Sequence, residues 1–147
     1  RRWLRLPLGR MVVEALEHDP RIGDLASAAL VPIPSHPVRE RERGYNQARE
    51  IARIAARHLR LPVVDCLLRL RPTGHLALLG RGGRLENLVG AFGVRSGRRR
   101  PDSSLLDGST VILVDDVLTT GATAHHAAHS LRMLASPAAS AAVLGAA

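Results

Sequence analysis

Residues 111–123 read VILVDDVLTTGAT, and this stretch decides the fold class of the chain. Its first four residues are β-branched or leucine and predict a short buried strand. Two adjacent carboxylates, Asp115 and Asp116, end that strand, and a turn of small residues then opens into an Ala-rich helix. In such a turn the backbone N–H groups and the helix dipole hold a phosphate, while the acids engage sugar hydroxyls or a hydrated cation. The stretch therefore indicates a site for a phosphate ester.

Two other classes of protein have strands that end in acids. A Walker B strand works with a Gly-x-x-x-x-Gly-Lys-Ser/Thr loop, and receiver domains of the response-regulator type rely on a lysine. This chain has no lysine, because all 21 of its basic residues are arginine, so both classes are excluded. An ordinary strand–helix turn with two acids is the remaining alternative, although adjacent like charges are usual mainly at functional sites.

The composition indicates one α/β domain. A chain of 147 residues is long enough for one core, and with only three aromatic residues that core must consist of Ala, Val, Leu and Ile. Strand-like and helical segments alternate, which favours a layered α/β sheet. The patterns predict helices over residues 11–18, 47–59 and about 123–134, and strands over 30–34, 63–70, 90–94, 111–114 and 140–144.

The formal net charge of +8 suggests anionic partners such as phosphates, nucleotides or nucleic acid. Coding bias is an equal alternative, because a GC-rich genome yields arginine without lysine alongside abundant alanine.

The single cysteine, Cys66, lies among apolar residues and is expected to be a buried, unreactive thiol. The stretches 117–131 and 133–147 are too short and Ala-rich to span a bilayer, and no signal peptide is apparent. We therefore expect a cytoplasmic protein without membrane insertion.

The first motif resembles the phosphoribosyl-pyrophosphate (PRPP) motif of the type I phosphoribosyltransferases. The resemblance implies that fold, a mostly parallel sheet flanked by helices with a flexible lid loop. It also implies that Asp115 and Asp116 contact the ribose hydroxyls and, through water, a Mg²⁺ cofactor. The loop that wraps the 5′-phosphate would consist of Thr119, Thr120, Gly121, Ala122 and Thr123.

Residues 31–47 read VPIPSHPVRERERGYNQ and form the second distinctive segment. Turn residues and arginines follow a strand there, which is where a doubly wound sheet places ligands. Together with the first motif, the segment resembles the ComF (competence protein) branch of phosphoribosyltransferase-like proteins, whose Arg-Gly-Phe-Asn-Gln signature has Tyr45 in place of Phe here. The resemblance assigns Ser35 and His36 to the pyrophosphate loop and lets Arg39 or Arg43 reach the pyrophosphate. The alternative is that these arginines belong to a solvated face and pair with Glu40 and Glu42.

A third segment fits the family pattern Thr-x-x-Gln-x-x-Leu-x-x-x-x-Arg-x-x-Asn. The matching residues are Thr73, Leu79, Arg84 and Asn87, with Arg84 as a candidate catalytic residue. In type I enzymes this region is the lid that closes over PRPP and keeps water from the reacting carbon. Leu76 stands where the pattern has Gln, and this change bears on catalysis more than on binding.

The resemblance covers residues 30 to about 145. We expect an N-terminal helical segment over residues 1–29 and a phosphoribosyltransferase-like domain over residues 30–147. Many ComF relatives have an N-terminal Cys₄ zinc ribbon, which this sequence with its single cysteine does not contain.

His125 and His129 have a spacing that metal ligands use, but no third ligand is evident, so exposed or helix-packing histidines are the favoured interpretation.

These features imply a protein that binds PRPP or another ribose 5-phosphate with Mg²⁺. As an enzyme of nucleoside metabolism it would be a glycosyltransferase, in which a nitrogen acceptor displaces pyrophosphate through positioning, charge neutralisation and exclusion of water. The alternative is a DNA-uptake accessory factor that binds single-stranded DNA or a competence helicase, with PRPP binding regulatory or vestigial. A PRPP-sensing regulator is a third hypothesis. The sequence names no acceptor and leaves a homodimer open.

Overall fold

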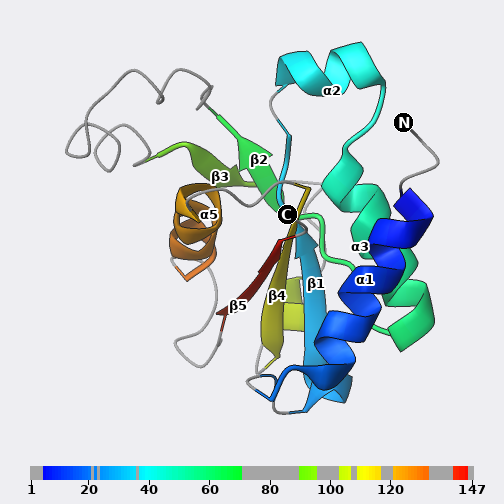
Figure 1. The fold of residues 1–147 in the computed structure, drawn as a ribbon. Coiled ribbons are helices and arrows are strands. Elements are labelled where there is room, and N and C mark those ends of the chain that lie inside the picture. Colours follow the sequence, from blue (N-terminus) through cyan, green and yellow to red (C-terminus); the bar gives the residue numbers. More distant parts are fainter. Residues whose placement is uncertain are drawn as a thin grey trace.

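The computed structural model describes residues 5–20, 22, 24–35, 37–70, 90–95, 103–106, 109–116, 121–132 and 141–145. These residues form an α/β arrangement in which helices cover both faces of a small parallel sheet (Figure 1). The predicted α/β class, with a parallel sheet flanked by helices, is confirmed at this level. Within the described ranges, no helix is long and apolar enough to cross a membrane.

The parallel sheet has the strand order β1-β4-β5. Its strands are β1 (Ala28–Pro32), β4 (Thr110–Asp115) and β5 (Ala141–Gly145). All of β1 and all but the first residue of β4 are buried, as expected for parallel strands that are covered on both faces. β1 begins two residues before the predicted strand over 30–34. Ile33, the residue after β1, still donates its N–H to the Val114 carbonyl at 2.8 Å.

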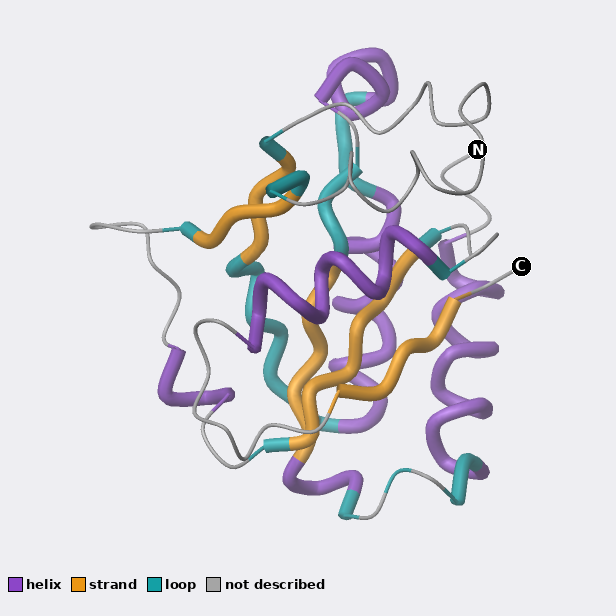
Figure 2. The backbone as a smooth tube through the Cα atoms, turned by 90° about the vertical axis from the view of Figure 1, so that its left-hand side faces the viewer, coloured by secondary structure: helices purple, strands orange, loops and turns teal. Residues whose placement is uncertain are grey.

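Two hydrophobic cores lie on opposite faces of the sheet because successive strand side chains point in opposite directions. Ile112 and Val114 of β4 belong to the core with the first and third helices, and Val111 and Leu113 belong to the core with the last helix. Figure 2 shows this last helix lying across the front of the strands. The described helices are α1 (Arg5–His18), α2 (Pro37–Arg43), α3 (Gln47–Leu59) and α5 (Ala122–Arg132), with 3₁₀ turns at Leu25–Ser27 and Ser103–Leu106.

The helix predicted over residues 47–59 has the observed bounds of α3. α1 is longer than the predicted helix over 11–18, because it begins at Arg5. α2 was not predicted, since its sequence PVRERER has one apolar side chain after the proline and therefore no apolar stripe. This helix lies above the carboxyl ends of the parallel strands in Figure 1.

The predicted strand over residues 63–70 is divided between two sheets. Val63 forms an isolated parallel bridge with Leu30, and the chain then leaves the parallel sheet. β2 (Leu67–Arg69) instead pairs antiparallel with β3 (Phe92–Val94). The predicted lid and Arg84 lie between these two strands, at positions outside the described residues.

Candidate functional site

The two adjacent carboxylates occupy the carboxyl end of the central strand. Asp115 is the last residue of β4 and is 8% exposed, whereas the side chain of Asp116 is 21% exposed. The Asp115 carboxylate accepts a hydrogen bond from the Asp116 backbone N–H at 2.8 Å. This bond turns one carboxylate toward the backbone and leaves Asp116 as the more accessible acid of the pair.

Arg43, the last residue of α2, lies beside the accessible acid. Its Nη1 is 3.4 Å from Asp116 Oδ2, although the two residues are 73 positions apart in sequence. The Arg43 side chain is 40% exposed, so the pair is worth about 1 kcal/mol or less. Its main electrostatic effect is to offset the repulsion between the neighbouring carboxylates.

The turn after β1 lies next to the same edge of the sheet. In the β1–β4 register Pro32 is the partner of Val114, so the chain continues to Ser35 on one side and Asp116 on the other. The hydroxyl of Ser35 donates to Asn46 Oδ1 at 3.5 Å. The structure thus brings Ser35, Arg43, Asp115 and Asp116 to one end of two neighbouring strands.

Asn46 holds this turn together, a role that was not predicted from the sequence. Its side chain is 2% exposed; Nδ2 donates to the Ile33 carbonyl at 3.3 Å, and Oδ1 accepts from the Arg49 N–H at 3.2 Å. The second bond makes Asn46 the N-cap of α3. An asparagine directly before an amphipathic helix is the signal that could have identified the cap.

The small-residue turn leads into α5 as the motif predicts. Gly121 has φ +73°, a left-handed conformation that glycine adopts at little cost, and α5 begins at the next residue. The Gly121 carbonyl accepts the His125 N–H at 2.9 Å, which closes the first turn of the helix. Ala122 and Thr123 therefore lie at a helix N-terminus that follows the acid-tipped strand.

Several other candidate site positions fall outside the described residues. Those left out entirely are His36, Arg84, Thr119 and Thr120, and the side chain of Arg39 is also not described. Their assignments remain predictions.

Cys66 and the three histidines of α5 are the other titratable candidates of the sequence that the structure describes. Cys66 is buried, and burial raises the pKa of its thiol to about 11, so the thiol is protonated at neutral pH. His125 and His129 are exposed, while His126 is buried and its pKa is lowered by burial and by its two histidine neighbours. Among the described side chains, no group of three or more His, Cys, Asp or Glu residues could hold a metal ion.

No protein-family model matches the chain. Competence protein F of Haemophilus influenzae is 30% identical to it over 134 residues, which cover 90% of this chain and 56% of that protein. Competence protein ComFC of Bacillus subtilis is 35% identical over 108 residues, which cover 69% of this chain and 37% of that protein. The chain thus spans about half the length, or less, of these curated relatives.

Proposed function

The chain belongs to the competence protein F (ComF) family, and from this premise we propose that it is a PRPP-binding protein with the type I phosphoribosyltransferase fold. We further propose that it acts in competence, the process in the names of its relatives. The observation that carries the binding proposal is the acid pair at the end of β4, followed by a left-handed glycine and the start of α5. This arrangement suits a ribose phosphate, because the carboxylates that accept from ribose hydroxyls and the N–H groups that donate to a phosphate lie close together in the sequence.

The donor set at this edge fits Mg²⁺. Mg²⁺ in proteins usually keeps several waters and is bound through one or two carboxylates together with substrate phosphates. Asp116, with its partly exposed carboxylate, is the residue best placed to hold the hydrated ion, and Asp115 is the second candidate. When bound, the ion would neutralise charge on the pyrophosphate.

The chain's own residues would bind and orient the sugar phosphate. Asp115 is buried and has one oxygen bonded to the backbone, so it offers a fixed acceptor to a ribose hydroxyl. Gly121, Ala122 and Thr123 would direct N–H groups at the 5′-phosphate. Ser35 and Arg43 would contact the pyrophosphate from the neighbouring strand end and from α2.

Transfer of the phosphoribosyl group is the enzymatic form of this proposal. The bond between the anomeric carbon and the pyrophosphate oxygen would break, a bond to an acceptor nitrogen would form, and that nitrogen would lose its proton. Arg84 and the predicted lid would exclude water during this step. The acceptor is a nitrogen compound that neither motif specifies.

The alternative is an accessory factor that binds single-stranded DNA or a helicase partner. The net charge of +8 favours it, because arginines supply the sequence-independent part of nucleic-acid affinity. In this version PRPP binding would regulate the protein or be vestigial.

Calorimetric titration with PRPP, in the presence and absence of Mg²⁺, tests the main proposal. We expect saturable binding that strengthens with Mg²⁺. Absence of heat and of thermal stabilisation at millimolar PRPP under both conditions would refute it, and oligonucleotide binding under the same conditions would then favour the alternative.

A further inference from the structure

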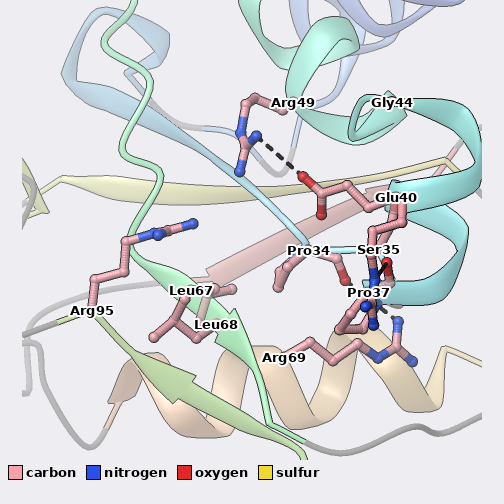
Figure 3. Close-up of a pocket in the computed structure, with 11 residues that line it drawn as sticks. Pro34, Ser35, Pro37, Glu40, Gly44, Arg49, Leu67, Leu68, Arg69 and Arg95 are labelled. Carbon is pink, nitrogen blue, oxygen red and sulfur yellow. Dashed lines mark hydrogen bonds and ion pairs between the residues drawn. The ribbon is translucent and has the colours of Figure 1, made fainter. Parts of the chain in front are cut away.

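A second candidate site lies beside the Ser35 turn. It is a pocket of about 370 Å³ between α2, α3 and the β2–β3 hairpin (Figure 3). Among the described residues it shares Ser35 with the proposed PRPP site, whereas Arg43, Asp115, Asp116 and Gly121 to Thr123 do not line it. The lining residues are Pro34, Ser35, Pro37, Glu40, Arg41, Gly44, Arg49, Leu67, Leu68, Arg69 and Arg95.

The pocket is strongly basic, because four arginines and one glutamate line it. Arg49 lies in α3, Arg69 in β2 and Arg95 directly after β3, and all three are only partly exposed. Asp65 lies behind two of them: its Oδ2 is 2.7 Å from Arg49 Nε and its Oδ1 is 3.9 Å from Arg95 Nη2. These contacts, together with Glu40 at 3.5 Å from Arg49 Nη1, leave the lining with an excess of positive charge.

The arginines are held in place before any ligand arrives. The Arg69 guanidinium donates to the Pro34 carbonyl at 3.4 Å and lies 5.5 Å from the centre of the Phe92 ring. Arg49 Nε is buried, and its contact with Asp65 is an ion pair without hydrogen-bond alignment. Because the planar guanidinium groups are positioned in advance, less side-chain entropy is lost when they bind an anion.

The rest of the lining is apolar. Pro34, Pro37 and Leu68 form walls beside the guanidinium groups, and the volume is within the range of small-molecule pockets. Arg49 and Arg95, whose side chains point toward one another in Figure 3, suit a tetrahedral dianion with three acceptor oxygens, whereas the Arg69 side chain points away from them. Flat apolar walls suit a planar ring attached to that anion.

We propose that this pocket binds a free nucleoside monophosphate, with the phosphate on Arg49 and Arg95 and the base against Leu68 and Pro37. Ser35 lies at both sites, but the pocket arginines and the acid pair do not, so variants of these residues test the two sites independently.

The experiment titrates the full chain with adenosine 5′-monophosphate by calorimetry, with adenosine and inorganic phosphate as separate probes. We expect the nucleotide to bind at least about tenfold more tightly than either part, because both the anion and the ring contribute. Arg95→Gln should weaken nucleotide binding about tenfold, and Arg95→Lys should restore only part of it, since lysine lacks the planar fork. Arg53→Gln is the matched control, because Arg53 is an exposed arginine of α3 that does not line the pocket.

Two further variants guard against misinterpretation. Arg41→Gln removes an exposed lining arginine whose loss should not affect folding. Like Arg95→Gln, it should weaken nucleotide binding. The double variant Asp115→Asn with Asp116→Asn removes the acids of the proposed PRPP site, to which the ribose 5-phosphate part of the nucleotide would also bind, and the nucleotide binding that depends on Arg95 should persist in it. The proposal is wrong if Arg95→Gln and Arg41→Gln bind the nucleotide normally, or if the acid variant abolishes binding, which would place the nucleotide in the PRPP site. It is also wrong if Arg95→Gln weakens the binding of a single-stranded oligonucleotide but not the binding of the free nucleotide.

Discussion

Arg43 Nη1 lies 3.4 Å from Asp116 Oδ2, and this contact joins the end of α2 to the end of β4. The arginine predicted to reach the pyrophosphate thus contacts the carboxylate predicted to serve the ribose and the metal. A cation beside Asp116 stabilises the ionised carboxylate, but it also competes with a divalent ion for the same oxygen. In the proposed function, this pair would couple binding of the metal to binding of the diphosphate.

The first prediction follows from this coupling. Replacing Arg43 by Gln should strengthen Mn²⁺ binding in the absence of PRPP by roughly two- to fivefold, because the competing cation is gone. The same change should weaken Mg²⁺–PRPP binding about tenfold, because a charged donor to the diphosphate is lost. Paramagnetic titration with Mn²⁺ and calorimetry with PRPP measure the two effects, with Arg53→Gln as the control. Equal changes in the same direction would argue against a dual role for Arg43.

The acid pair itself gives the second prediction. Asp115→Asn combined with Asp116→Asn should abolish Mg²⁺-dependent PRPP binding while the fold persists, because asparagine retains an oxygen that can accept the Asp116 backbone N–H. Circular dichroism and thermal unfolding check the fold, and calorimetry checks binding. Glu42→Gln, at an exposed acid of α2, is the control. Normal PRPP affinity in the double variant would falsify the assignment of these acids.

The third prediction concerns the phosphate end of the site. Ribose 5-phosphate soaked into crystals should place its phosphate at Gly121, Ala122 and Thr123, where N–H groups begin α5. Gly121→Ala should destabilise the protein by about 1–2 kcal/mol, because alanine is strained at φ +73°, even though nothing lies within 4 Å of the added Cβ. A phosphate that binds elsewhere in the soaked crystals would refute the assignment of this turn.

Asn46 provides a stability prediction. Asn46→Ala removes the N-cap of α3 and leaves the Ile33 carbonyl without its side-chain donor, so the free energy of unfolding should fall by about 2–3 kcal/mol. Asn46→Ser should lose less, because serine can still cap the helix. Urea unfolding distinguishes the two variants. If the serine and alanine variants are equally destabilised, the cap contributes little and the bond to Ile33 dominates.

The DNA-binding alternative has its own prediction. Arg98, Arg99 and Arg100 lie outside the described residues. In sequence they belong to the connection before the motif strand, whereas the acids are at the carboxyl end of that strand. Changing all three to Glu should reduce affinity for single-stranded DNA and spare PRPP binding, and the affinity of the unaltered protein should fall steeply with salt. Fluorescence anisotropy with a labelled oligonucleotide measures both. No binding at low salt would leave the binding of small molecules as the proposed activity.

Local patterns in the sequence were sufficient to predict several elements. α3 has the predicted bounds because its apolar side chains recur at helical spacing between Asn46 and Pro62. β4 and the start of α5 follow from a run of buried aliphatic residues, two acids and a glycine turn. In each case the determining interactions lie within one turn or one strand, so the sequence alone contains them.

Other features depend on contacts between distant parts of the chain. α2 has no apolar stripe of its own, and the 63–70 segment divides because Val63 meets Leu30 while Leu67 meets Val94. The basic pocket likewise assembles arginines from α2, α3 and the β2–β3 hairpin.

The sequence by itself determined the α/β class, the central strand with its paired acids and the helix that follows. Only the tertiary structure decided that Arg43 would meet Asp116 and that Asn46 would hold the Ser35 turn. The physical reason is that parallel pairing of β1 with β4 sets which residues share an edge of the sheet. That pairing joins strands far apart in the chain, so no local pattern of residues specifies it.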